Sequence, residues 1–418
     1  MSLESAAPAG LDPRFPALDT LRAVGALAVL TTHVGFESGA YTRYDVWGPF
    51  LARLDLGVAL FFVLSGFLLS RPYLAAAARG GRAPRTGRYF WKRFLRIMPV
   101  YAVTVVLVMA LTPDNADASP RDWLVTLLLA NTYLDPLLPS GLTQMWSLAV
   151  EVAFYLILPA LMLVAVGRRR PLSAPRVVLL LVAMTAISLW WHLDGAAYWD
   201  RHSSGAPLQW LPAYLSWFAV GIGLALVQVL HVHGTGSRPG GRVVEGIVAA
   251  GRQPGSCWAL AGGLLLVATT PVGGPVLLLA PTASESLAKS LLYAAISGLL
   301  VLPGVFAGPE TRFARIMSAP AARHLGLISY GVFCIHMSLL HVVRDVLGLE
   351  LFTGGFVVTW VVLVAVSLVA AELLYRLVEL PAMRWRHLPA PWRRTARSGS
   401  TGSGSDSSAA STGTSTRN

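Results

Sequence analysis

The chain alternates long apolar runs with short polar segments rich in arginine. Many of the runs reach the roughly 20 residues that a helix needs to cross a hydrocarbon core about 30 Å thick. The pattern therefore predicts an all-α, polytopic membrane helix bundle. Eleven runs are candidate spans: 18–36, 54–70, 97–112, 123–134, 145–166, 177–193, 208–230, 257–280, 287–306, 324–346 and 354–377.

The positions of the basic residues decide which runs cross. Arg71, Arg96 and the six basic residues between them follow the second run, and the positive-inside rule places them in the cytoplasm. If segment 123–134 crossed, the arginines at 168–170 would fall outside. At 12 residues it is short for a crossing, so we place it at the outer interface. We therefore predict about ten spans in a multi-pass protein of the cell inner (plasma) membrane, with both termini cytoplasmic.

Composition supports a membrane protein with a single domain. The chain is 55% hydrophobic and 13% charged, whereas a soluble domain is about a quarter charged. We expect a short cytoplasmic N-terminus at 1–15, a transmembrane domain at 16–387 and a disordered cytoplasmic tail at 388–418, where Ser, Gly and Thr dominate. The first run starts late and lacks a small-residue cleavage site, so we expect it to stay as a span.

The net charge of +12 does not indicate nucleic-acid binding, because the strong preference for Arg over Lys is what a GC-rich genome produces. The partner expected from composition is the lipid bilayer. Cys257 and Cys334 both fall in apolar runs without a Cys/His pattern, so we expect neither a disulfide nor a metal site.

The first run carries two ionisable residues, which are costly in a span and are functional candidates for that reason. Arg22 and His33 are eleven positions apart, about three helical turns and 16 Å of rise, and share one face. In the predicted topology Arg22 lies near the inner side and His33 in the outer half. Arg22 could instead only extend to the inner headgroups, and His33 could make a structural hydrogen bond between helices.

Glu151 belongs to a run that enters from the outside and reaches nearly the depth of His33. A carboxylate beside an imidazole fixes its orientation, which suits a general base that takes a proton from a hydroxyl. Glu37, one turn beyond His33, is a rival partner, and Glu151 could also be structural. His336 lies within a run and could line the same cavity, although packing is the simpler role; His341 is a weaker candidate.

Several stretches in this order and spacing resemble the acyltransferase 3 family, the bacterial integral-membrane O-acyltransferases. The resemblance covers about 16–387. It rests on LDTLRAVGALAVLTTH at 18–33, LGVALFFVLSGFLLSR at 56–71, YFWKRFLRIMPVY at 89–101, MWSLAVEVAFYLILPAL at 145–161, LGLISYGVFCIHM at 325–337 and RLVELPAMRW at 376–385.

The resemblance implies transfer of an acyl group, most often acetyl, from acyl-coenzyme A to a hydroxyl of a carbohydrate or a glycosylated metabolite, without a metal. It also implies that His33 is catalytic, with Glu151 at the family's acidic position. Arg93 and Arg96 match a cytoplasmic Arg-x-x-Arg motif thought to contact the coenzyme A phosphates. Arg22, from the Arg-x10-His motif, is placed with them as a cofactor-binding residue. Ser65 joins His336 as a candidate cavity-lining residue.

Two other functions remain open on the residues alone. Titratable groups at matched depth could form the proton relay of a transporter of a small molecule. The bundle could also be a non-catalytic scaffold, with segment 88–96 a lipid-facing amphipathic stretch. Many relatives carry a fused extracytoplasmic domain and this chain ends in a polar tail, which leaves the acceptor open. Val-Glu-Leu-Pro at 378–381 replaces the commoner Glu-Arg-Pro and looks conservative.

Overall fold

A computed structural model describes residues 15–135, 137–233, 240–276 and 279–387. Every regular element in these ranges is helical. Ten of the helices correspond to the ten expected spans: α1 (Pro16–Glu37), α4 (Leu56–Ala78), α5 (Thr86–Leu111), α8 (Met145–Val166), α9 (Ala174–Trp190), α11 (Leu211–Val232), α13 (Pro254–Thr269), α14 (Ala283–Phe306), α16 (Pro320–Val346) and α17 (Phe356–Leu374).

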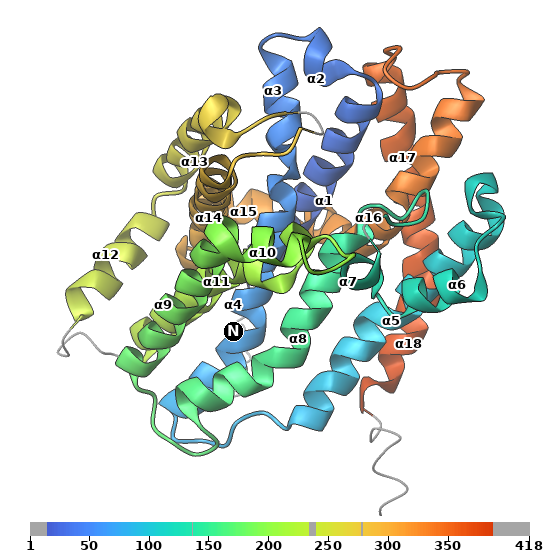
Figure 1. Ribbon diagram of the computed structural model, residues 1–418. Coiled ribbons are helices and arrows are strands. Elements are labelled where there is room, and N and C mark those ends of the chain that lie inside the picture. Colours follow the sequence, from blue (N-terminus) through green and yellow to red (C-terminus); the bar gives the residue numbers. More distant parts are fainter. Residues whose placement is uncertain (1–14, 136, 234–239, 277–278, 388–418) are drawn as a thin grey trace, which may run out of the picture.

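Short helices connect and extend these ten. They are α2 (Ala40–Arg43), α3 (Trp47–Ala52), η1 (Arg53–Asp55), η2 (Pro113–Asn115), α6 (Pro120–Leu127), α7 (Asn131–Leu134), η3 (Trp191–Gly195), α10 (Ala196–Asp200), η4 (Pro207–Gln209), α12 (Gly241–Gly251), η5 (Pro271–Gly273), α15 (Arg312–Met317), η6 (Tyr375–Glu379), α18 (Leu380–Arg384) and η7 (Trp385–His387). Figure 1 shows a single bundle, with α12, α13 and α14 at one side and α5, α6 and α18 at the other.

The predicted fold class is confirmed, and the chain is a polytopic helical membrane protein. In the described part of the chain, eight helices, some with their short extensions, are long and apolar enough to cross a membrane. The other two expected spans are α13, which is shorter, and α1, which carries Arg22 and His33. Segment 123–134 does not form a long helix: it is divided between α6 and α7, as its shortness predicted.

Small residues let the central helices touch backbone to backbone. A Cβ at Gly221 on α11 would overlap the carbonyl oxygen of Val63 on α4, and one at Gly66 would overlap the Phe218 carbonyl. A Cβ at Gly326 would likewise overlap the carbonyl oxygen of Asp19, which brings α16 against α1. In membranes such close contacts replace the hydrophobic driving force between helices. They fix how α1, α4, α11 and α16 are placed around the site.

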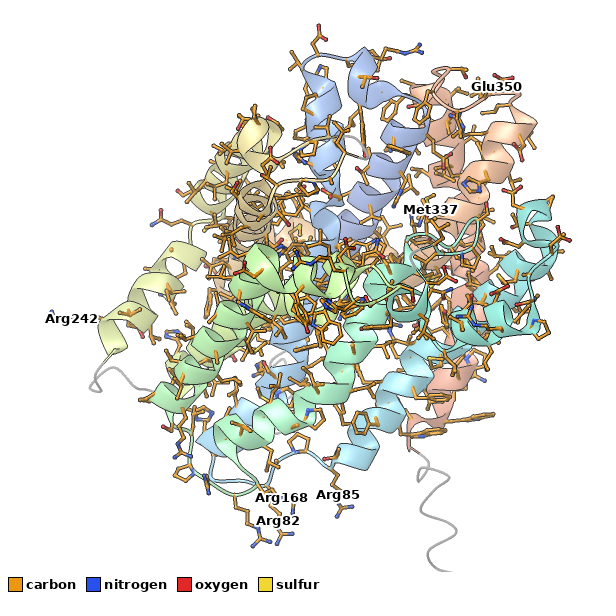
Figure 2. The ribbon with its side chains drawn as sticks, in the orientation of Figure 1. Arg82, Arg85, Arg168, Arg242, Met337 and Glu350 are labelled. Atoms are coloured by element: carbon orange, nitrogen blue, oxygen red, sulfur yellow. The ribbon has the colours of Figure 1, made fainter. Side chains whose placement is uncertain are left out.

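The two ends of the bundle differ in charge. Figure 2 shows Arg82, Arg85 and Arg168 together at one end and Glu350 at the opposite end. This asymmetry is the one on which the predicted orientation depends. The orientation itself remains a prediction, as do the expected domain boundaries, because residues 1–14 and 388–418 lie outside the described part of the chain.

Candidate active site

Helices α1, α4, α5 and α8 contribute charged or polar side chains to one cavity, the arginine cavity, of about 80 Å³. Its polar wall contains Arg22 of α1, Ser65 of α4, Arg93 and Arg96 of α5 and Glu151 of α8. Arg93 and Arg96 reach the same wall because residues three apart share a helix face. Five of the seven candidate site residues from the sequence therefore meet here.

The three arginines of this cavity have different partners. Arg96 forms an ion pair with Glu379 of η6, whose side chain is only 3% exposed, so its charge is already balanced. Arg22 is 3.2 Å from the carboxylate of Asp19. Arg93 lies over the ring of Tyr155, 5.9 Å from its centroid, and its buried Nε has no hydrogen-bond partner. Arg93 therefore has a buried donor that bonds to no described residue.

Glu151 is held by two hydroxyl groups and not by an imidazole. Ser65 Oγ and Tyr155 OH both donate to its Oε1, the second at 2.5 Å. In the described residues no hydrogen bond joins Glu151 to His33, which lines a different cavity. The structure therefore does not show the expected contact between Glu151 and His33.

His33 faces a second space, the histidine cavity, of about 520 Å³. Its ring contacts that of His336 on α16, with 5.3 Å between centroids. His336 is wholly buried and lines neither cavity. Its Nδ1 lies 2.9 Å from the Phe333 carbonyl, to which it can donate, and its Nε2 has no partner. This tautomer leaves the Nε2 lone pair available next to His33.

The rival carboxylate, Glu37, lines the histidine cavity but pairs elsewhere. Its Oε1 lies 3.2 Å from His341 Nε2 and its Oε2 lies 3.7 Å from Arg344 Nε. Both partners come from α16, more than 300 residues along the chain. His341 was only a weak candidate from the sequence, because nothing in a single sequence aligns α1 with the C-terminal end of α16.

The two cavities meet at three side chains. Val58, Ser147 and Phe333 line both of them. Arg22 and His33 lie on the same helix, about 16 Å apart along its axis, with one in each cavity. A long, thin group that starts in the arginine cavity would therefore reach His33 by passing this boundary.

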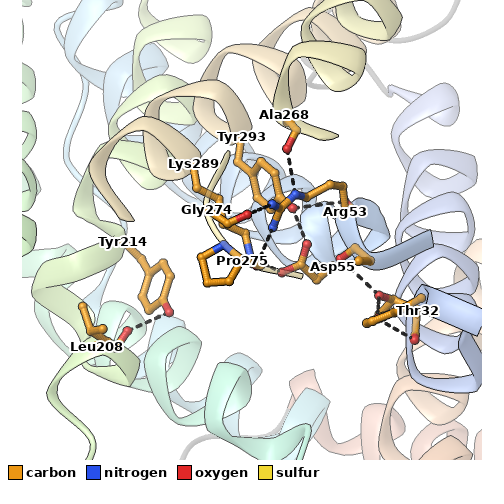
Figure 3. Close-up of polar contacts among 12 residues, drawn as sticks. Thr32, Arg53, Asp55, Leu208, Tyr214, Ala268, Gly274, Pro275, Lys289 and Tyr293 are labelled. Atoms are coloured by element: carbon orange, nitrogen blue, oxygen red, sulfur yellow. Dashed lines mark hydrogen bonds and ion pairs between the residues drawn. The ribbon is translucent and has the colours of Figure 1, made fainter. Parts of the chain in front are cut away.

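A buried arginine fixes the wall opposite His33. Arg53 of η1 is 1% exposed and donates to the carbonyl oxygens of Ala268, Gly274 and Pro275. This structural role of Arg53 was not apparent from the sequence. Figure 3 shows how its contacts tie η1 to the segment after α13.

Comparison with known proteins assigns the family. Residues 15–376 match the family model described as an acyltransferase domain. The chain belongs to the acyltransferase 3 family. This is the family that the sequence motifs indicated. No solved structure shows a significant match to the chain.

Curated relatives match parts of the chain. A peptidoglycan O-acetyltransferase of Listeria monocytogenes is 30% identical over 36% of this chain and 24% of its own length. Acyltransferase MdmB of Streptomyces mycarofaciens is 35% identical over 35% of the chain and 38% of its own length. A putative peptidoglycan O-acetyltransferase of Bacillus subtilis is 31% identical over 42% of this chain and 28% of its own length. The chain thus spans well under half of each of these relatives.

The described residues contain no group of three or more His, Cys, Asp or Glu side chains placed to hold a metal ion. The polar chemistry described above comes from imidazole, carboxylate, hydroxyl and guanidinium groups.

Proposed function

We propose that this acyltransferase moves an acyl group, most often acetyl, from acyl-coenzyme A to a hydroxyl of a carbohydrate or glycosylated metabolite, with His33 as the general base. The observation that carries the proposal is the pair of cavities on α1. One contains Arg22 and Arg93, the other contains His33, and they meet at Val58, Ser147 and Phe333.

The arginine cavity suits the donor. Coenzyme A carries phosphates at one end and a thin pantetheine arm at the other. A guanidinium stays charged at all relevant pH values and matches phosphate geometry. Arg93, with its unpartnered Nε, is the candidate phosphate contact, and Arg22 contributes positive charge to the same cavity. The pantetheine arm then extends past the boundary between the two cavities and brings the thioester toward His33.

The histidine cavity suits the transfer step. His33 takes the proton of the acceptor hydroxyl while its oxygen attacks the thioester carbonyl. The carbon–sulfur bond breaks, and the proton passes from His33 to the departing thiolate. His336 positions the base, because its free Nε2 can accept the N–H of His33 on the side away from the acceptor. Since Glu151 bonds Ser65 and Tyr155, we assign it to the arginine cavity and not to His33.

The relatives support a carbohydrate acceptor. Two of those described above are named as peptidoglycan O-acetyltransferases, one of them putatively. They match this chain over only part of their length, so a carbohydrate acceptor for this chain is part of the proposal. A transporter is the second candidate, because ionisable groups lie in both cavities.

Proteoliposomes separate the two candidates. Purified protein is reconstituted with acetyl-coenzyme A outside and an N-acetylglucosamine trisaccharide sealed inside. The proposal predicts free thiol outside and acetylated sugar inside, both abolished in His33→Ala. It also predicts that Arg93→Ala raises the KM for acetyl-coenzyme A. Movement of the sugar without thiol release, insensitive to Arg93→Ala, would instead favour transport.

A further inference from the structure

A third cavity adjoins the histidine cavity and extends it sideways. This side cavity, of about 340 Å³, shares Asp55, Val58, Trp146, Pro275 and Lys289 with the histidine cavity. We propose that it binds the second ring of an extended, uncharged glycan whose first ring presents its hydroxyl to His33. This inference rests on the proposed acyl transfer and specifies its acceptor.

Size favours an extended acceptor. Pockets for small molecules usually measure about 300–1,000 Å³. The histidine cavity, at about 520 Å³, and the side cavity, at about 340 Å³, both lie within that range and adjoin at the shared residues. Figure 3 shows Tyr214, with its hydrogen bond to Leu208, next to Pro275, and Asp55 on the other side of Pro275. A single sugar ring at His33 would leave the side cavity unused.

Lys289 and Asp55 form an ion pair where the two cavities join. Lys289 Nζ lies 2.6 Å from Asp55 Oδ2, and Tyr293 OH donates to the other carboxylate oxygen. The side chains of Lys289 and Asp55 are still 33% and 38% exposed. An ammonium has three donors and a carboxylate about four acceptor sites, so each keeps capacity for a hydroxyl of a ligand.

The contacts of the nearby Arg53 hold the Lys289–Asp55 pair in place. Arg53, two residues before Asp55, is fixed by three backbone carbonyl groups. The hydrogen-bonding groups are therefore positioned before a ligand binds, which lowers the entropy cost of binding.

Aromatic rings also line the side cavity. The ring centroids of Trp146 and Tyr214 lie 5.4 Å apart, and those of Tyr214 and Trp217 lie 4.8 Å apart. Hydrogen bonds from Trp217 to the Ser290 carbonyl and from Tyr214 to the Leu208 carbonyl fix both rings. Flat apolar faces next to paired donors and acceptors match a sugar ring, which has C–H faces and a rim of hydroxyl groups.

The charge of the lining argues for a neutral ligand. The side cavity contains Asp55, Glu285 and Lys289, a formal charge of −1 with His192 neutral. A phosphate or another anion would meet a carboxylate without a surplus of cations. An uncharged oligosaccharide meets no such repulsion.

The test measures how acceptor length affects KM. Wild type, Lys289→Gln and Lys289→Gln/Asp55→Asn are assayed by thiol release from acetyl-coenzyme A with N-acetylglucosamine and its di- and trisaccharide. Arg121→Gln, at a position outside the three cavities, is the matched control. The double variant removes both charges, so it shows whether an unpaired Asp55 alone accounts for a defect.

The wild type should have a KM about tenfold lower for the disaccharide than for the monosaccharide, equivalent to about 1.4 kcal/mol. Both variants should lose that difference, with the monosaccharide KM and kcat within about twofold of wild type. Arg121→Gln should behave as wild type. An unchanged preference for the longer sugar in Lys289→Gln, or no preference in wild type, overturns the subsite.

Calorimetric titration with the trisaccharide, without acetyl-coenzyme A, separates this proposal from the proposed function. About tenfold weaker binding in Lys289→Gln, with no thiol release in any sample, keeps the subsite and refutes acyl transfer. Thiol release with equal trisaccharide binding in all variants keeps acyl transfer and refutes the subsite. Absence of both binding and release refutes both.

Discussion

The two arginines of the Arg-x-x-Arg pair are expected to fail in different ways when each is replaced by alanine. Arg93 has an unpartnered donor in the arginine cavity, whereas Arg96 forms an ion pair with the buried Glu379. Arg93→Ala should therefore weaken donor binding in a folded protein. Arg96→Ala should first destabilise the packing of η6 against α5.

The magnitudes follow from these contacts. A hydrogen bond to a charged group contributes about 1.5–3 kcal/mol. At about 1.4 kcal/mol per factor of ten, the KM of Arg93→Ala for acetyl-coenzyme A should rise about 10- to 150-fold. Removing one partner of a buried ion pair costs about 3–5 kcal/mol, because the other charge is left uncompensated. Arg96→Ala should thus lower the melting temperature by several degrees or fail to fold.

The assay combines a melting curve in detergent with thiol-release kinetics. Arg96→Met/Glu379→Gln is the control, since it removes both charges and should recover much of the stability lost in Arg96→Ala. The reasoning is refuted if Arg93→Ala unfolds while Arg96→Ala melts as wild type. It is also refuted if the double variant is no more stable than Arg96→Ala.

Three further sets of substitutions test the helix packing, the passage between the two cavities and the role of His336. Gly221→Ala should lower stability by about 1–3 kcal/mol, seen as a lower melting temperature, because its Cβ overlaps the Val63 carbonyl; an unchanged melting temperature would contradict this close contact. Phe333→Ala should widen the boundary and raise the use of butyryl- over acetyl-coenzyme A about tenfold, measured by kcat/KM; an unchanged ratio would mean that Phe333 does not limit the path. His336→Phe should lower kcat up to about tenfold with KM unchanged, and His336→Gln should restore part of it, because only the second retains an acceptor for His33; equal kcat in both would exclude a positioning role.

Hydropathy and charge predicted the fold well because both act directly on membrane insertion. Apolar length located the ten helices that correspond to the expected spans, and the positive-inside rule excluded segment 123–134, which is divided between α6 and α7. The family motifs named Arg22, Arg93 and Arg96 as donor-binding residues, and these three line one cavity.

Depth alone could not predict which of these side chains touch. Glu151 and His33 were placed at similar depth, but depth does not fix the rotation of each helix about its axis. In the structure they line different cavities. The Arg96–Glu379 and Asp55–Lys289 pairs were missed for a related reason: each joins helices far apart in the chain, and a single sequence does not show which distant helices pack together.

The most direct test of the account is transfer of radiolabelled acetyl from acetyl-coenzyme A to an N-acetylglucosamine oligosaccharide by purified wild type and His33→Ala. General base catalysis contributes about 10²–10⁴-fold, so the account predicts at least a hundredfold loss in His33→Ala. The melting temperature and the affinity for coenzyme A, measured by titration, should stay as in wild type. Transfer within tenfold of wild type, in a variant that binds coenzyme A normally, would contradict the central role of His33.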